Sequence, residues 1–273
     1  GSAVRLGVED RASNELVALL RSTVGVSEVQ VYRQGGPMNL AEVAQIAGLV
    51  DRPELKFPPF TPTVREPLRS AENIFDAIAR RDILLHHPYE SFSTIIDFIE
   101  KAAKDPDVLA IKQTMYRTSG DSKIIKALMA AAANGKQVAA LMEVKARFDE
   151  ERNITWAREM ERAGVHVVYG LVGLKTHSKI CLVVRKEKGG LRRYVHLSTG
   201  NYNPITARVY TDLGLLTCDP DLCDDAGELF NLLTGYSYNP HWLKMVVAPI
   251  EMRKFFLDMI DAEIDRARAG TGG

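Results

Sequence analysis

His177 and Lys179 stand two residues apart at the start of an apolar run typical of a β-strand. On a strand, residues i and i+2 point to the same face, so both side chains can reach one ligand. An imidazole can attack phosphorus and form a covalent intermediate, while an ammonium stabilises charge on the non-bridging oxygens. The pair favours covalent phosphoryl chemistry. The alternative is that His177 is a hydrogen-bonded structural histidine.

Two arginines occupy comparable places after other strand-like runs. Arg117 follows the apolar run 108–115, and Arg147 follows 138–144. In open α/β sheets, ligands bind just past the carboxyl ends of strands, and a guanidinium can hold a phosphate with two parallel hydrogen bonds. We expect Arg117, Arg147 and Lys179 to converge on one anion-binding pocket, with both guanidiniums within about 12 Å of the His177 ring.

Charge is unevenly distributed in a chain whose 35 basic and 35 acidic residues cancel. Residues 171–210 contain eight lysines and arginines against Glu187 alone, a net charge of +7, and residues 211–231 carry −6. A positive block of this density favours an anionic partner, most simply phosphate. For part of the block a solvated hairpin is the better interpretation. The residues concerned are Lys186, Lys188, Arg192 and Arg193.

The middle of the chain alternates between strand-like and helical patterns, which is typical of βαβ units. The sequence therefore predicts an α/β fold with a mixed, largely parallel sheet flanked by helices. The expected strands are 83–87, 108–115, 138–144, 165–169, 212–217 and a hairpin of 179–185 with 193–197; the expected helices are 91–104, 122–133, 153–163 and 222–234.

The first sixty residues form a separate pattern. A strand at 3–8, a helix at 15–20, a strand at 29–32 and a helix at 39–47 are expected there. Five prolines then fall between positions 53 and 67, a density that indicates an extended linker. We place a domain boundary near residue 63, so that the N-terminal segment is a small piece of a second domain.

Composition excludes several classes of protein. Hydrophobic residues make up 46% and charged residues 26%, which excludes wholesale disorder. No apolar run approaches the ~18 residues of a membrane helix, and no signal peptide is visible. Three cysteines suggest a reducing, cytoplasmic setting, and the spacing of Cys218 and Cys223 is only weak support for zinc.

Several longer motifs resemble a known family. His-x-Lys followed by Gly-Asn is similar to half of a phospholipase D superfamily site, and the longer motifs resemble the first family of polyphosphate kinases. These motifs span nearly the whole chain. They lie at residues 51–62, 85–89, 111–118, 145–151, 173–179 and 199–203.

The resemblance implies a role for each matched position. His177 matches the phosphohistidine, and Arg117 and Arg147 match positions associated with Mg²⁺, which a guanidinium can serve only through shared phosphate oxygens. Tyr210 matches an ATP contact, and His196 a second histidine of the motif. The superfamily analogy makes Lys179 and Asn201 phosphate stabilisers. The expected catalytic residues are His177, Lys179 and His196, and the expected substrate-binding residues are Tyr210, Arg117, Arg147 and Asn201.

Enzymes of this family are longer than this chain. The resemblance assigns residues 1–63 to the end of the head domain, 64–245 to the first C-terminal catalytic domain, and 246–273 to the opening helix of a second. It implies reversible transfer of the γ-phosphate of ATP to polyphosphate with Mg²⁺ as cofactor, in a cytoplasmic homo-oligomer that can associate with membranes. It implies no nucleic-acid partner and no transmembrane segment. With half of the superfamily site missing, we expect the isolated chain to be weakly active or inactive.

Other readings remain open at this stage. The chain could be a phospholipase D-like phosphodiesterase completed by homodimerisation, or a non-catalytic module that binds polyanions. The remaining alternative is an α/β protein with no catalytic or binding activity. Formation of phosphohistidine from labelled ATP would separate the kinase interpretation from the rest.

Overall fold

The structure is a computed structural model that describes residues 2–116, 122–143, 150–170, 173–236 and 240–271. Its internal contacts divide the chain into two compact units, residues 1–60 and residues 61–273. Arg117 and Arg147 lie outside the described residues. All of the expected site residues belong to the second unit.

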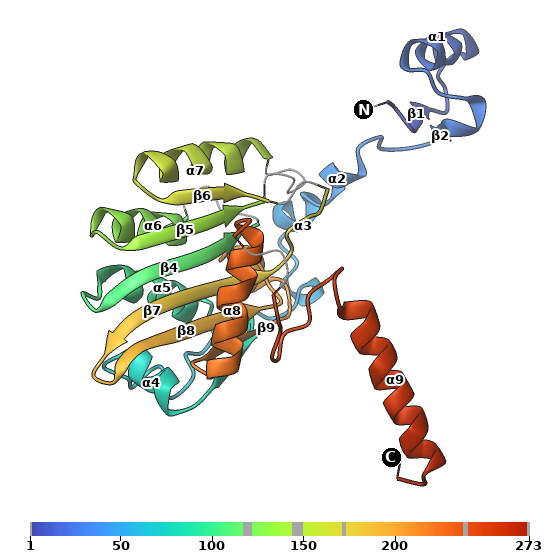
Figure 1. The fold of residues 1–273 in the computed structure, drawn as a ribbon. Coiled ribbons are helices and arrows are strands. Elements are labelled where there is room, and N and C mark those ends of the chain that lie inside the picture. The colour runs from blue at the N-terminus through green and yellow to red at the C-terminus, as the bar shows by residue number, and fades with distance from the viewer. Residues whose placement is uncertain (1, 117–121, 144–149, 171–172, 237–239, 272–273) are drawn as a thin grey trace. The chain divides into compact units, whose positions relative to one another are not determined.

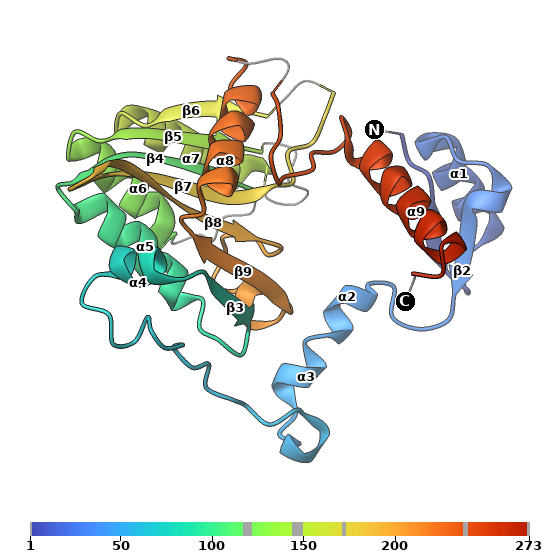
Figure 2. The ribbon, with the colours of Figure 1, turned by 60° about the horizontal axis from the view of Figure 1, so that its bottom comes forward.

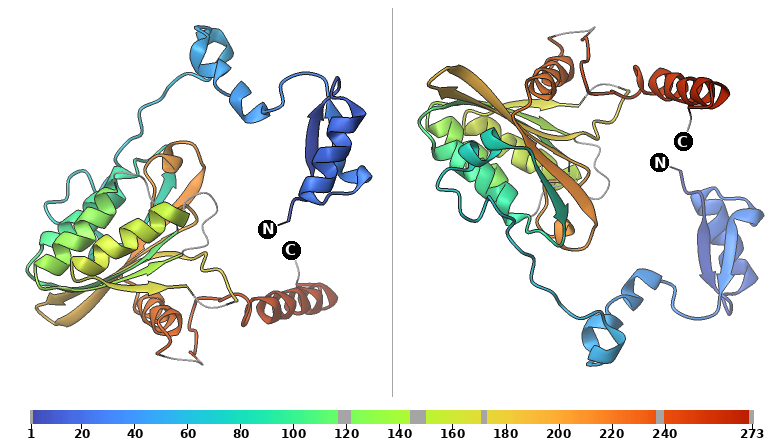
Figure 3. Two further views of the ribbon diagram at one scale, coloured as in Figure 1. Left: turned by 90° about the horizontal axis from the view of Figure 1, so that it is seen from above. Right: turned by 90° about the horizontal axis from the view of Figure 1, so that it is seen from below.

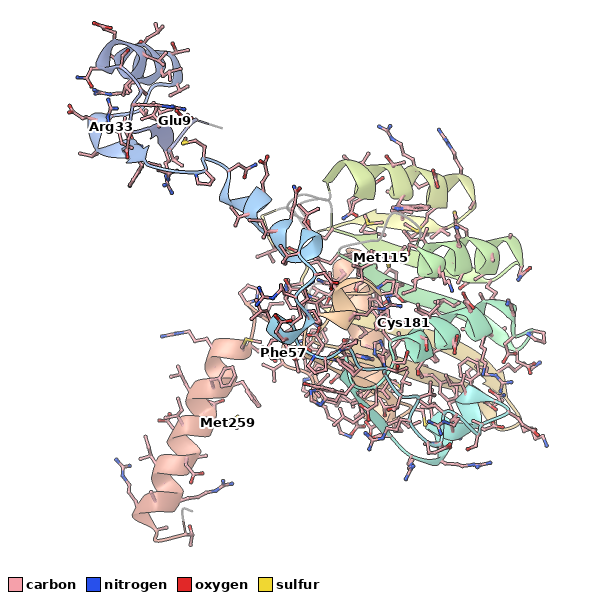
Figure 4. All side chains as sticks on the ribbon, turned by 180° about the vertical axis from the view of Figure 1, so that it is seen from behind. Glu9, Arg33, Phe57, Met115, Cys181 and Met259 are labelled. Carbon is pink, nitrogen blue, oxygen red and sulfur yellow. The ribbon has the colours of Figure 1, made fainter. Side chains whose placement is uncertain are left out.

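The first unit contains a small β-α-β arrangement, β1 (Leu6–Glu9), α1 (Asn14–Val24) and β2 (Val31–Gln34), in which the two strands are parallel. Glu9 and Arg33, one on each strand, are labelled in Figure 4. The helix expected at 39–47 is divided into α2 (Leu40–Val43) and α3 (Ile46–Leu49). The proline-rich stretch also includes one short 3-10 turn, η2 (Pro53–Leu55), although a linker without regular structure was expected.

The second unit is built on a seven-stranded sheet with the order β3-β9-β8-β7-β4-β5-β6 (Figure 1). The expected strands are all present, with small differences at their ends. They are β3 (Ile83–His87), β4 (Val108–Met115), β5 (Gln137–Met142), β6 (His166–Tyr169), β7 (Lys179–Glu187), β8 (Gly190–Ser198) and β9 (Asp212–Thr217).

The sheet confirms the mixed α/β class but is less parallel than expected. Only β4, β5 and β6 pair in parallel, and the remaining neighbours, from β3 through β9, β8 and β7 to β4, are antiparallel. The physical reason is that β7, β8 and β9 stand between β3 and β4, the two strands that α5 connects, so parallel neighbours remain only where α6 and α7 connect β4, β5 and β6. The tight turn between β7 and β8 forces an antiparallel hairpin.

Helices cover both faces of the sheet (Figures 1 and 3). One face carries α4 (Ile74–Arg80), α5 (Ser93–Lys104), α6 (Lys123–Ala133) and α7 (Glu150–Arg162), and the opposite face carries α8 (Pro220–Leu233). Met115 and Cys181, labelled in Figure 4, belong to the larger of the two hydrophobic cores, which lies under α4 to α7. The short helix α4 was not expected from the sequence.

The last helix is α9 (Met252–Arg268), drawn in red in Figure 2. None of its residues is buried. Its exposed apolar side chains include Phe255, Phe256 and Ile260. No helix in the described part of the chain combines the length and apolar composition that a transmembrane span needs.

Candidate functional site

The ends of three adjacent strands meet at one edge of the sheet. Met115, at the end of β4, pairs with Met142 at the end of β5, and Gln113 pairs with Cys181 near the start of β7. Tyr116 directly after β4, Glu143 directly after β5 and the residues directly before β7 are therefore neighbours. The pairing of Lys179 with Ser198 brings the end of β8 to the same edge.

His177 lies at this edge against an aromatic ring. The Tyr116 ring packs edge-on to the His177 imidazole, with 5.3 Å between ring centroids. Two ammonium groups lie near the same tyrosine: Lys179 Nζ is 5.1 Å and Lys175 Nζ 5.2 Å from its centroid. Lys179 also donates a hydrogen bond to the His177 carbonyl oxygen at 2.6 Å. The structure thus places two cations and a histidine around one tyrosine.

The electrostatic setting suits His177 as a nucleophile. Partial burial of the ring, together with the positive charges of Lys179 and Lys175, lowers the pKa of His177 below its ordinary value. The imidazole is therefore mainly neutral at pH 7, with a free nitrogen lone pair. The same two ammonium groups can balance an incoming anion.

The backbone around His177 is held by buried polar groups. Glu143, directly after β5 and only 3% exposed, accepts a hydrogen bond from the Thr176 backbone N–H at 2.8 Å. Asn153 on α7 is fully buried and donates to the carbonyl oxygens of Tyr116 and Glu143. These contacts fix the segment that carries His177 without using its imidazole.

The loop after β8 is pinned at several points. Thr199 Oγ1 donates to the Asp212 carboxylate at 2.9 Å, and a Cβ on Gly200 would collide with that same carboxylate, so glycine is required there. Asn203 Oδ1 accepts from the Ile205 backbone N–H at 2.9 Å. Between these anchors, the buried Oδ1 of Asn201 has no hydrogen-bond partner among the described groups.

His196 does not lie at the surface of this edge. It is 0% exposed near the C-terminal end of β8, and its Nδ1 is 2.8 Å from the Tyr202 hydroxyl oxygen. Burial, with a smaller effect of nearby His87, lowers the pKa of His196 to about 3. The expected catalytic role of His196 stays a prediction, and in this structure the ring is closed off from solvent. Its contact with Tyr202 makes it a support for the 199–203 loop.

The remaining expected positions are less completely defined. Tyr210 is 60% exposed and follows η3 (Thr206–Arg208), just before β9. An exposed ring there is free to stack on a ligand. The prediction that Arg117 and Arg147 converge on His177 falls on positions outside the described residues and stays a prediction.

A mainly apolar cavity of about 580 Å³ adjoins the His177 segment. Residues 174–180 form one wall, while Leu229, Leu232 and Leu233 of α8 form another. Residues 245–250 line a further side of the cavity. The polar edge and the apolar cavity lie next to each other at the same end of the sheet.

The described residues do not supply a protein-only metal site. They contain no group of three or more histidine, cysteine, aspartate or glutamate side chains placed to hold a metal ion. Mg²⁺ prefers oxygen ligands and keeps several waters, so it often binds through substrate phosphates. The described side chains therefore fit a Mg²⁺ ion that binds together with a phosphate better than one that is coordinated by the protein alone.

Comparisons with known proteins decide the family. Residues 73–239 match the family model described as polyphosphate kinase C-terminal domain 1. A polyphosphate kinase from Mycolicibacterium gilvum is 53% identical over 277 residues, covering 100% of this chain. The chain belongs to the polyphosphate kinase family. The family resemblance expected from the motifs is thereby confirmed.

Other polyphosphate kinases extend the comparison. The Pseudomonas aeruginosa protein is 47% identical over 99% of this chain, and the crystal structure from Porphyromonas gingivalis matches 99% of it with a TM-score of 0.83 and 31% identity. A phospholipase D family member from Salmonella typhimurium reaches a TM-score of 0.45 at 14% identity, too low to decide the fold. The chain spans 38%, 39% and 41% of the Mycolicibacterium, Pseudomonas and Porphyromonas chains, respectively.

Sequence reasoning missed several residues that shape the site. Tyr116, Glu143 and Lys175 stand in the polar clusters at the strand ends but received no roles. Asn153 was taken only as the start of a helix. A signal was present, because Asn153 shares the buried face of α7 with Ala157 and Met160 at helical spacing. A polar residue on an apolar face needs a hydrogen-bond partner.

Proposed function

We propose that this chain carries the phosphate-accepting half of an ATP:polyphosphate phosphotransferase site, with His177 as the covalent carrier. The observation that supports it most is the position of the His177 ring beside Lys179 and Lys175 at the convergent strand ends, where burial and the two positive charges lower the pKa of the ring. Membership of the polyphosphate kinase family supports the choice of substrates.

The proposed reaction has two balanced steps. A ring nitrogen of His177 forms a bond to the γ-phosphorus of ATP, and the bond to the bridging oxygen breaks as ADP leaves with the electron pair. A terminal oxygen of polyphosphate then attacks that phosphorus, and the P–N bond breaks to restore neutral His177. Lys179, Lys175 and the proposed phosphate contacts of Arg117, Arg147 and Asn201 stabilise the charge of the transferring group.

The proposal includes Mg²⁺ and a nucleotide contact. The metal would be held by phosphate oxygens that Arg117 and Arg147 also bind, and it would neutralise phosphate charge. The exposed Tyr210 ring would stack on the adenine of ATP. The three cysteines are free thiols, which supports a reducing, cytoplasmic setting.

The test is transfer of label from [γ-³²P]ATP to the chain, with His177→Ala as control. We expect acid-labile, alkali-stable label on His177. We expect net polyphosphate synthesis near background, because this chain spans only 38% to 41% of the length of the polyphosphate kinases it matches. Tight polyphosphate binding without label on His177 would favour a non-catalytic polyanion-binding module. Hydrolysis of a phosphodiester that depends on His177 would favour the phosphodiesterase.

A further inference from the structure

The side chain of Asn153 joins the ends of two strands. Its Nδ2 donates to the Tyr116 carbonyl oxygen at 2.9 Å and to the Glu143 carbonyl oxygen at 3.0 Å. Carbonyl oxygens only accept hydrogen bonds, so the amide must present its nitrogen to both strands. The two oxygens are bonded to one nitrogen and therefore lie within about 6 Å of each other.

This contact stands where the regular β4–β5 pairing stops. The last paired residues are Met115 and Met142, and the Glu143 N–H still donates to the Met115 oxygen at 2.9 Å. The next residues along the two strands are Tyr116 and Glu143, and a backbone carbonyl oxygen shielded from water needs a hydrogen-bond donor. Asn153 supplies that donor to both from α7, so one helix residue holds both strand ends.

Both carbonyl partners of Asn153 also contact the segment that carries His177. The Tyr116 ring packs on the His177 imidazole, and the Glu143 carboxylate accepts from the Thr176 N–H at 2.8 Å. In the chain, Tyr116 is followed directly by Arg117, and Glu143 leads to the stretch containing Arg147. Asn153 is thus coupled, through Tyr116 and Glu143, to the segment that carries His177.

We propose that Asn153 is a positioning residue for this phosphoryl-transfer site, acting through Tyr116 and Glu143 on His177. The proposal rests on the function proposed above for His177. Without the amide, the ends of β4 and β5 lose their shared donor. The Tyr116 ring then loses its fixed place against the imidazole, and anion binding weakens because its donors no longer converge.

The experiment compares Asn153→Ala with a matched control, Asn134→Ala. Asn134 also donates from Nδ2 to a backbone carbonyl, that of Ala103 at 3.1 Å, but it lies at the end of α6 that precedes β5, opposite the site. Nuclear magnetic resonance reports the contact between the Tyr116 and His177 rings and the titration of His177. Calorimetry reports the affinity for tripolyphosphate, and thermal melting reports stability.

We expect Asn153→Ala to lose the ring contact, to move the pKa of His177 up toward its ordinary value, and to weaken tripolyphosphate binding at least tenfold. Asn134→Ala should leave all three unchanged even if its melting temperature falls as far. Retention of both the ring contact and the affinity in Asn153→Ala would overturn the proposal. An equal loss in Asn134→Ala would do the same.

Two further outcomes are covered. If Asn153→Ala does not fold, the smaller change Asn153→Ser takes its place with the same expected losses. If the parent chain binds no tripolyphosphate, the proposed function fails in its binding step. The ring contact and the His177 titration then still decide the role of Asn153.

Discussion

The two ends of the β7–β8 hairpin use positive charge in opposite ways. At the turn end, Arg185 is paired with Asp105 at 2.9 Å, Asp107 at 3.4 Å and Glu187 at 2.8 Å, and its guanidinium lies 5.4 Å from the Phe75 ring centroid. At the open end, Lys175 and Lys179 face the ring of Tyr116 beside His177. The arginine at the turn end is ion-paired with carboxylates, whereas the two lysines at the open end lie near a histidine.

Basic residues that are close together in the sequence therefore do not form one continuous surface with a single role. The solvated-hairpin interpretation holds for exposed Lys186, Lys188 and Arg192, while exposed Arg193 is ion-paired with Asp224. The acidic stretch is likewise partly structural, because buried Asp225 accepts three backbone N–H groups at 2.7 to 2.8 Å. Of the two ends described here, the open end is the one that places lysines beside a histidine.

The largest expected effect is on stability at the turn end. Arg185→Met removes a largely buried cation shared by three carboxylates, two of which lie in partly buried positions. We expect the free energy of unfolding to fall by about 2 kcal/mol, since breaking a buried ion pair leaves charge uncompensated. Urea denaturation measures this, and tripolyphosphate affinity should not change. A variant as stable as the parent would show that the two ends do not differ as described.

Next in size is the effect on anion binding at the open end. Lys179→Met keeps the side-chain volume but removes a cation beside His177, and we expect tripolyphosphate affinity to fall about tenfold, or roughly 1.4 kcal/mol. Arg193→Met, the control at the turn end, should stay within about twofold.

The salt dependence of polyphosphate affinity tests the same contrast between the two ends. Affinity of the parent should fall steeply as salt rises, because bound polyphosphate releases condensed counterions as nucleic acids do. Calorimetry at low and high salt measures this. One affinity at both salt levels would mean that the basic stretch is merely a solvated surface.

A smaller effect is expected in the titration of His177. Burial and the charges of Lys179 and Lys175 hold its pKa below the ordinary value, and Lys175→Met should raise it. The folded ring binds its proton less tightly than the unfolded one. Its contribution to stability is therefore complete above the ordinary histidine pKa and is lost as the pH falls through it toward the folded value. Ring resonances measured against pH check this, and an unchanged titration in the variant would contradict it.

The smallest effect is expected at the hairpin turn. Lys188 is exposed, and Lys188→Ala should change the free energy of unfolding by less than about 0.5 kcal/mol. Tripolyphosphate affinity should stay at the parent value. Denaturation and calorimetry on this variant set the baseline for Arg185 and Lys179. A clear loss of affinity here would mean that the turn end also binds the ligand.

Prediction from sequence succeeded where local pattern decides structure. Alternating apolar residues located every strand of the sheet, and His-x-Lys with its neighbouring clusters identified the family. It failed where distant segments decide. The antiparallel order from β3 to β4 depends on how hairpins add to the sheet, and the short α4 is stabilised by the burial of Ile74, Phe75 and Ile78.

Residue type and spacing are enough to establish the family, the alternation of strands and helices, and the residues able to do phosphoryl chemistry. Which of those residues are accessible depends on the packing of the folded chain. That packing buried His196 against Tyr202 and left Tyr210 exposed. It also brought Asn153 between Tyr116 and Glu143, residues far apart along the chain. The burial of a side chain and the meeting of distant residues both depend on how segments pack against one another, so the sequence of one segment does not determine them.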